Sequence, residues 1–280
     1  MTAFVLSGGA NQGVAQVGML RALLERGITP DVLIGTSAGA LNAAAIARAP
    51  TPEVVDGLEQ IWLGLTGEQI FPGGTLQRAW NVLRRDDHLT PNDGLLQLVT
   101  RATEPAREFA DFEVPLRVVT TDLDTGDEIV VVAGPVAPAL LASAAIPGVF
   151  PPVQLNGHRL VDGAVVNLVP ISHALAGPVN RIFVLDVSDP IADRPIRSPL
   201  DVAIRAFAIS RDQRFELELR WVPADVDVVV LPAPPDDREF FDYSGGEALI
   251  REAHKLALQA LDDYDAGGGR RARRRWWRRG

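Results

Sequence analysis

The chain has 280 residues, 47% of them hydrophobic, which is enough for one sizeable core. It contains no cysteine, and this excludes disulfides, thiolate metal sites and a cysteine nucleophile. The formal net charge is −9, but the last eleven residues hold seven arginines and no acid, so an acidic body precedes a basic tail.

The first ten residues, MTAFVLSGGA, lack both the basic region and the long apolar run of a signal peptide. No stretch of the sequence reaches the roughly 18 to 20 apolar residues that span a bilayer. We therefore expect a cytoplasmic protein that meets a membrane only at its surface.

The first fifty residues alternate short apolar runs with helical patterns. Ala3–Leu6 predicts a buried strand, and apolar residues between positions 13 and 26 recur every three or four residues, which predicts a helix ended by Gly27. Asp31–Ile34 predicts the next strand and Ala38–Arg48 a helix of small residues. The order strand, helix, strand, helix favours a parallel sheet with right-handed connections and helices on both faces.

The remainder of the chain continues this α/β pattern. Residues 51–112 indicate helices and loops, and Leu116–Thr121 with Glu128–Ala133 predicts a hairpin around Asp124–Asp127. The other expected elements are a short helix at Pro138–Ala145, strands at Arg159–Val161, Arg181–Val187 and 226–231, a long helix at 200–220 and an amphipathic helix at 246–263. Gly267–Gly269 predicts a break before a disordered Gly/Arg/Trp-rich tail over residues 266–280.

A serine lies between glycines where the second predicted strand meets the second predicted helix. Gly35-Thr36-Ser37-Ala38-Gly39 matches the G-x-S-x-G pattern of a nucleophile elbow. Such a turn exposes the serine hydroxyl on a strained backbone, and Gly35 and Gly39 avoid the collisions that side chains would cause there. The helix that follows aims amide hydrogens at a nearby oxyanion. Against a chance match in a Gly/Ala-rich helix start, the flanking elements favour Ser37 as a nucleophile.

A second small-residue loop, from Ser7 to Gly13, joins the first predicted strand to the first helix. A phosphate-binding loop is excluded, because Val14 and Ala15 stand where the Walker motif requires Lys and Ser or Thr. The dinucleotide fingerprint fails as well, since Ala10 replaces its second glycine. An oxyanion hole beside the serine and a plain tight turn remain, and we favour the oxyanion hole.

No histidine is an obvious acceptor for the Ser37 proton. The chain has four, in stretches typical of surface or packing positions: His88, His158, His173 and His254. Asp162 is better placed, since it ends a predicted strand and precedes Gly163, although an Asp-Gly pair is also typical of an ordinary β-turn. No cluster of histidines and carboxylates has the spacing of metal ligands, and we expect no metal and no cofactor.

Together, these motifs resemble the patatin-like phospholipase family. The family's glycine-rich oxyanion loop, G-x-S-x-G elbow and downstream Asp-Gly-Gly/Ala correspond here to Gly8–Gly13, Gly35–Gly39 and Asp162–Ala164. Thr121–Gly126 and Ala142–Pro152 also look like family blocks, so the resemblance covers about residues 3–187. It implies a three-layer α/β/α sandwich with a mainly parallel central sheet, in one domain over residues 1–265.

The resemblance also implies a Ser-Asp dyad. Ser37 is then the nucleophile, and Asp162 is the base that takes its proton and later activates water to hydrolyse the acyl-enzyme. The oxyanion hole that the resemblance implies consists of backbone amides from Gly8, Gly9, Ala10, Asn11 and Ala38. Four glycines support the geometry of the motifs: Gly13, Gly35, Gly39 and Gly163.

Two positions depart from the family pattern. Ala10 replaces the third glycine of the loop, and a positive φ there would strain the backbone by ~1 kcal/mol or more. Gln12 replaces an Arg or Lys and keeps a hydrogen-bond donor without the charge. The expected function is a serine lipid acyl hydrolase of phospholipase A or lysophospholipase type. A catalytically silent lipid-binding or regulatory protein and a non-lipid esterase or thioesterase stay open.

The basic tail over Arg270–Arg279 contains Trp276 and Trp277. Three interpretations of this tail stay open. It is a solvated end of the chain, a segment that binds anionic lipid headgroups with both indoles at the membrane interface, or a segment that binds nucleic acid. Besides a lipid or acyl-ester substrate, the partner that we expect is an anionic membrane and not nucleic acid. The sequence predicts no oligomeric state.

Overall fold

The computed structural model describes residues 1–70, 90–188, 199–236, 238 and 242–268. Over these residues, eight strands form one sheet of order β5-β6-β3-β2-β1-β7-β8, with β4 also paired to β3. The strands are β1 (Thr2–Leu6), β2 (Val32–Thr36), β3 (Leu116–Asp122), β4 (Glu128–Val131), β5 (Val153–Leu155), β6 (His158–Asp162), β7 (Arg181–Leu185) and β8 (Asp227–Leu231). β1, β2, β3, β7 and β8 run parallel, and β4, β5 and β6 are antiparallel to their neighbours.

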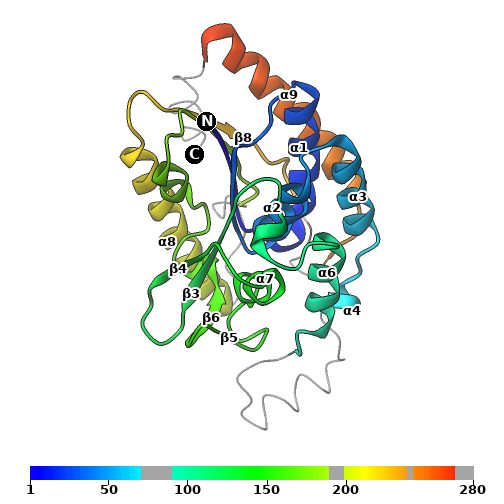
Figure 1. The fold of residues 1–280 in the computed structure, drawn as a ribbon, viewed down its shortest axis with the longest axis vertical. Coiled ribbons are helices and arrows are strands. Elements are labelled where there is room, and N and C mark those ends of the chain that lie inside the picture. Colours follow the sequence, from blue (N-terminus) through cyan, green and yellow to red (C-terminus); the bar gives the residue numbers. More distant parts are fainter. Residues whose placement is uncertain (71–89, 189–198, 237, 239–241, 269–280) are drawn as a thin grey trace.

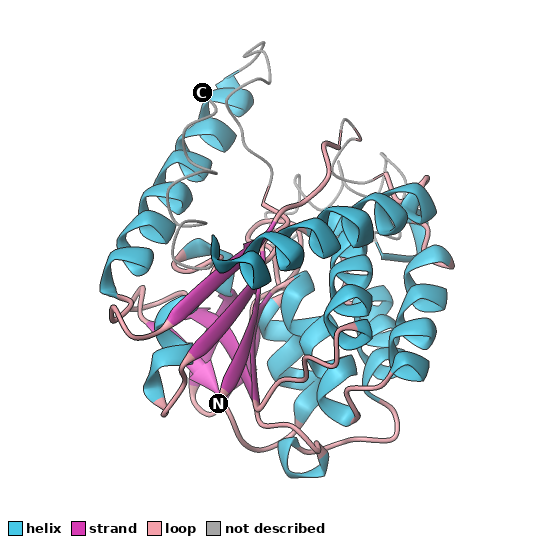
Figure 2. Ribbon diagram, turned by 90° about the horizontal axis from the view of Figure 1, so that it is seen from above, coloured by secondary structure: helices cyan, strands magenta, loops and turns pink. Residues whose placement is uncertain are grey.

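Helices cover both faces of this sheet (Figures 1 and 2). The helices are α1 (Ala15–Glu25), α2 (Ala38–Arg48), α3 (Pro52–Leu63), α4 (Gly67–Ile70), α6 (Asp93–Thr103), α7 (Val136–Ser143), α8 (Pro199–Trp221) and α9 (Gly246–Asp263), with short 3₁₀ turns η1 (Ala10–Val14), η2 (Phe109–Asp111), η3 (Gly163–Val165) and η4 (Ile171–Ala176). In the ranges given above, none of these helices combines the length and the apolar character needed to cross a membrane.

The core has two halves, one on each face of the sheet. Phe4 and Leu6 of β1 belong to the half that includes α1, α2, α3, α6, α7 and α9. Ala3 and Val5 point the other way, because successive side chains of a strand alternate, and they belong to the half beside η4 and α8. The predicted three-layer α/β/α arrangement around a mainly parallel sheet is therefore confirmed.

The predicted strands and helices appear close to their expected positions, with three differences. The first helix starts as η1 and becomes α-helical only at Ala15. β5 was not expected; it forms a hairpin with β6 through Asn156 and Gly157, whose φ values of 52° and 85° fit a two-residue turn. At the C-terminus, α9 is followed by a short π turn, Tyr264–Gly268, which was not expected and in which Gly267 has a non-helical φ of 90°. His88 and residues 269–280 lie outside the described part of the chain.

The last helix, α9, closes the molecule by packing on α1 at a glycine. A Cβ atom at Gly18 of α1 would lie 2.1 Å from the carbonyl oxygen of Ile250 and 2.8 Å from the amide nitrogen of His254, both backbone atoms of α9. The two helices therefore touch backbone to backbone, and this contact requires glycine.

Gly18→Ala should lower the free energy of unfolding by about 1–3 kcal/mol, because the methyl group would push α9 away from α1. Gly57→Ala is the matched control: Gly57 lies on the exposed side of α3, and a Cβ atom there would meet no other atom within 4 Å. Alanine at position 57 should stabilise that helix by about 0.5–1 kcal/mol. Urea unfolding measures both variants. Equal effects at the two positions would contradict the close contact between α1 and α9.

Candidate active site

Two strands of opposite direction end against each other along one edge of β3. β4 pairs with Val118–Thr121 of β3, so the remaining two partners of β3 share its other edge. On that edge β2 pairs with Leu116–Val119 and β6 with Thr120–Asp122. β2 runs toward this junction and is followed by Ser37, whereas β6 runs back toward it and ends at Asp162. The sheet thus joins two residues that are 125 positions apart in the sequence.

The Ser37 hydroxyl donates a hydrogen bond to the Asp162 carboxylate, with 2.7 Å between Oγ and Oδ2. Both side chains are buried, since the residues are only 6% and 3% exposed. The other carboxylate oxygen, Oδ1, accepts the Ala164 amide at 2.8 Å. Burial raises the pKa of Asp162 to about 7, although the hydrogen bonds from Ala164 and Ser37 oppose the rise. A carboxylate with this pKa is a stronger base than an ordinary aspartate.

The turn that carries Ser37 has the strained backbone expected of an elbow. Ser37 has φ 55° and ψ −127°, a region that residues with a side chain rarely adopt. A Cβ atom on Gly35 would lie 2.6 Å from the Cα of Ala40, and one on Gly39 would lie 2.3 Å from the carbonyl oxygen of Leu6. These contacts explain why the turn needs a glycine two residues on either side of the serine.

A second serine holds the backbone of the elbow. The Ser37 amide donates to Ser143 Oγ at 2.9 Å, and Ser143 in turn donates to the Val119 carbonyl at 2.7 Å. Ser143 is fully buried at the end of α7, so it ties the elbow to β3 from the helical layer. Sequence reasoning assigned this residue no role, and its place in the Ala142–Pro152 block was the only signal that pointed to it.

The backbone amides that we expect to form the oxyanion hole differ in their hydrogen bonding. The Gly8 amide donates to the Leu168 carbonyl at 3.1 Å. Over the described ranges, the amides of Gly9, Ala10 and Ala38 donate to no other group. These three backbone amides are candidates for binding an oxyanion.

Two residues of this loop affect its conformation: Ala10 through its backbone and Asn11 through a hydrogen bond of its side chain. Ala10 has φ 48°, so the strain expected at this departure from the family pattern is present. The side chain of Asn11 is buried, and its Nδ2 donates to the Asp242 carbonyl at 2.7 Å, which ties the loop to the segment before α9. The Asn11 side chain therefore has a structural partner.

Buried amide side chains hold both ends of the glycine loop. Asn42 Nδ2 donates to the Gly13 carbonyl at 2.9 Å and to Gln16 Oε1 at 2.8 Å. Gln16 Nε2 donates to the Ser7 carbonyl at 2.9 Å. Trp62 Nε1 completes the network by donating to Asn42 Oδ1 at 2.8 Å. Because all of these groups are buried, each lost hydrogen bond would leave an unsatisfied polar atom, and the network fixes the loop.

The histidines within the described residues pair with carboxylates other than Asp162. The pairs are His158 with Asp122 at 2.6 Å, His173 with Glu128 at 2.6 Å and His254 with Glu25 at 2.7 Å. The hydrogen bond from His158 lowers the pKa of Asp122. The described ranges also hold no group of three or more His, Asp or Glu residues that could bind a metal ion.

A strained serine at a strand-to-helix turn, paired with a buried carboxylate under a glycine loop, defines the site on this α/β fold. A family model, patatin-like phospholipase, matches residues 4–175 of the sequence. The chain belongs to this family.

Known relatives agree with that assignment. An uncharacterised NTE family protein of Mycobacterium tuberculosis is 29% identical over 191 residues, which cover 65% of this chain and 30% of that protein. Lysophospholipase NTE1 of Mycosarcoma maydis is 26% identical over 252 residues, which cover 90% of this chain and 12% of that protein. The chain thus spans less than a third of either relative. Among solved structures, VipD of Legionella pneumophila has a TM-score of 0.48 and 14% identity over 94% of this chain and 67% of its own.

Ala10→Gly should raise the free energy of unfolding by up to about 1 kcal/mol, because glycine adopts φ 48° without strain. Ala15→Gly is the control, since Ala15 has φ −65°, and it should lower stability by about 0.5–1 kcal/mol. Chemical denaturation of both variants measures the difference. A loss of stability at position 10 as large as that at position 15 would show that Ala10 is not strained.

Proposed function

We propose that the protein is a serine lipid acyl hydrolase that cleaves carboxylic esters through an acyl-enzyme on Ser37. The observation that supports this best is the buried hydrogen bond of 2.7 Å between Ser37 Oγ and Asp162 Oδ2, with the pKa of that carboxyl raised to about 7. In this proposal the nucleophile and its base are in contact without a histidine between them. The name of the relative lysophospholipase NTE1 supports a lysophospholipid or phospholipid substrate.

In the proposed reaction, Ser37 Oγ attacks the ester carbonyl while Asp162 Oδ2 takes its proton. The negative charge that develops on the carbonyl oxygen is stabilised by the amides of Ala38, Gly9 and Ala10. Removal of one such donor typically costs about 100- to 1000-fold in rate. The protonated Asp162 then donates to the departing alcohol oxygen, which leaves an acyl group on Ser37. Asp162, now ionised again, activates a water molecule that hydrolyses this acyl-enzyme.

A catalytically silent lipid-binding protein is the alternative that the altered loop favours. Ala10 and Gln12 both lie in that loop, and the Gly8 amide is paired with the Leu168 carbonyl. This alternative keeps the fold and the lipid but predicts no acyl transfer to Ser37. A non-lipid esterase or thioesterase would use the same residues on a smaller or differently activated acyl group.

Ser37→Ala and Asp162→Asn should each lower kcat on a chromogenic long-chain acyl ester by at least about 1000-fold, because either change removes the nucleophile or its base. Asp124→Asn, at an exposed carboxylate beyond the end of β3, is the matched control and should keep full activity. Circular dichroism checks that all three variants fold. Undiminished turnover by Ser37→Ala would discard the assignment.

The same proteins distinguish the alternatives when they are treated with a fluorophosphonate probe. Labelling of the wild type but not of Ser37→Ala excludes the silent binder. Lysophosphatidylcholine and a short-chain nitrophenyl ester are then compared by kcat/KM: preference for the lipid supports the proposal, and preference for the short ester supports a non-lipid esterase.

The raised pKa of Asp162 predicts a pH dependence. Asp162 must be ionised to accept the Ser37 proton, so kcat/KM should rise about tenfold per unit below pH 7 and level off above it. Initial rates on a non-ionising ester between pH 5 and 9 measure this profile. A profile that is flat from pH 5 upward would mean that Asp162 is already ionised there, and the proposed role of burial would be wrong.

A further inference from the structure

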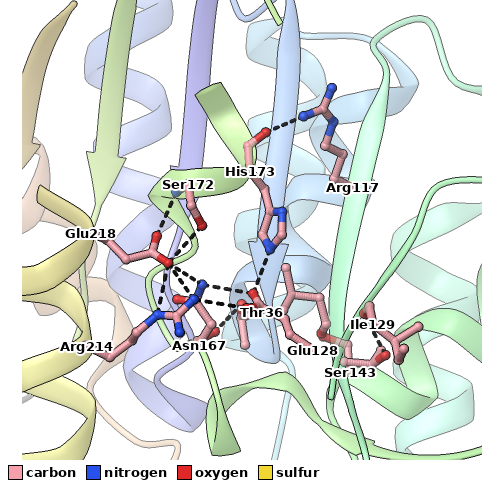
Figure 3. Close-up of polar contacts among 12 residues, drawn as sticks. Thr36, Arg117, Glu128, Ile129, Ser143, Asn167, Ser172, His173, Arg214 and Glu218 are labelled. Carbon is pink, nitrogen blue, oxygen red and sulfur yellow. Dashed lines mark hydrogen bonds and ion pairs between the residues drawn. The ribbon is translucent and has the colours of Figure 1, made fainter. Parts of the chain in front are cut away.

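Helix α8 lies beyond the region matched by the family model and sends two charged side chains into a polar cluster on the sheet (Figure 3). We call this group the α8 cluster; its members are Glu128, Asn167, Ser172, His173, Arg214 and Glu218. Arg214 and Glu218 come from α8, and Glu128 comes from β4. Asn167 bonds to both carboxylates and is almost fully buried.

The backbone of Asn167 contacts both halves of the proposed dyad. Its carbonyl accepts a hydrogen bond from Thr36 Oγ1 at 3.0 Å, and Thr36 is the residue immediately before Ser37. Its amide donates to the Gly163 carbonyl at 2.8 Å, and Gly163 is the residue immediately after Asp162. One residue therefore links the elbow to the turn that carries the base.

The side chain of Asn167 is oriented by two carboxylates. Nδ2 donates to Glu128 Oε1 and to Glu218 Oε1, each at 2.9 Å. Oδ1 is buried and has no hydrogen-bond partner among the residues that the structure describes. A flipped amide would place Oδ1 against both carboxylates, which repel it, so only one orientation of the side chain is stable.

Glu218 is itself held in place from several directions. It is fully buried, and its carboxylate accepts the Ser172 amide at 2.6 Å, the Ser172 hydroxyl at 2.8 Å and Arg214 Nε at 3.0 Å. Arg214 also reaches Glu128 Oε2 at 3.1 Å and so spans the two carboxylates. A buried carboxylate with this many donors has little freedom to move, and it provides a rigid support for Asn167.

We propose that Asn167, held by Glu128 and by Glu218 of α8, is the positioning residue that keeps Ser37 and Asp162 at reacting distance. This inference rests on the proposed function. It follows from the two backbone contacts, since a shift of Asn167 moves the elbow and the base relative to each other. A misplacement of about 1 Å in such a pair can cost about 100-fold in rate.

Four single variants and one double variant test this. Thr36→Val removes the hydrogen bond to the Asn167 carbonyl at nearly constant volume, and Thr36→Ser restores the hydroxyl. Glu218→Ala removes a support of Asn167 from α8. Glu216→Ala, two residues away on the same helix, removes a carboxylate whose ion pair within the described part of the chain is an exposed one with Arg220, at 3.6 Å. The readouts are kcat, KM, the rate of fluorophosphonate labelling and the thermal midpoint.

Thr36→Val and Glu218→Ala should each lower kcat and the labelling rate about tenfold or more while KM stays within about twofold, because geometry and not binding is lost. Thr36→Ser should recover most of the rate, and Glu216→Ala should match the wild type. Thr36→Val/Glu218→Ala should be no more than about twofold slower than the slower single variant, because both changes act through Asn167.

Several outcomes would overturn the inference. The first is a wild-type kcat in Thr36→Val. The second is a loss of kcat in Thr36→Ser that equals the loss in Thr36→Val. The third is a loss of kcat in the double variant that equals the product of the two single losses. If Glu218→Ala does not fold, the comparison of Thr36→Val with Thr36→Ser still tests the role of Asn167. An inactive wild type, or full activity in Ser37→Ala, would instead refute the proposed function, so the two failures are distinguishable.

Discussion

The hydrogen bond between Ser37 and Asp162 is the interaction on which the rest of the structure depends. It requires two strands that run in opposite directions to end at the same point, and the antiparallel β6 meets this requirement beside the parallel β2. It also requires that the carboxylate leave water, and this burial raises the pKa of Asp162 to about 7. In the proposed mechanism, a base of that strength needs no imidazole between the two residues.

This arrangement is costly, and buried polar networks on both faces of the sheet offset the cost. Ser37 and Ala10 have positive φ, and Asp162 is a buried acid. On one face, the side chains of Gln16 and Asn42 bond to the ends of the glycine loop. On the other face, the α8 cluster bonds to the segment that follows the base. The glycine loop is thus supported from one layer of the sandwich, and the elbow and the turn after Asp162 are supported from the other layer through Asn167.

Local features of the site were predictable from the residues themselves. Among the contacts between distant segments, the Ser37–Asp162 pair was expected only through the family resemblance, and the others were not expected. Gly35 and Gly39 indicate the close backbone approach that a nucleophile elbow requires, so the five residues Gly35–Gly39 were enough to predict the elbow. The Gly8 amide was expected to be free, but it pairs with Leu168, which comes from a loop 160 residues later. Glu218 carries no local signal, and Ser143 only its place in the Ala142–Pro152 block, because their roles arise when α7 and α8 pack on the sheet. The β5–β6 hairpin around Asn156-Gly157 was not expected, and it is the pairing of β6 with β3 that brings Asp162 to Ser37.

The central claim is that Asp162 is a buried base in contact with Ser37, and the most direct measurement is the titration of its carboxyl carbon by NMR. The resonance is assigned by its loss in Asp162→Asn. The structure predicts a midpoint near pH 7, and a further rise in Ser37→Ala, since the serine hydrogen bond favours the ionised form. A midpoint near the ordinary value of about 4, unchanged in Ser37→Ala, would contradict both the burial and the contact.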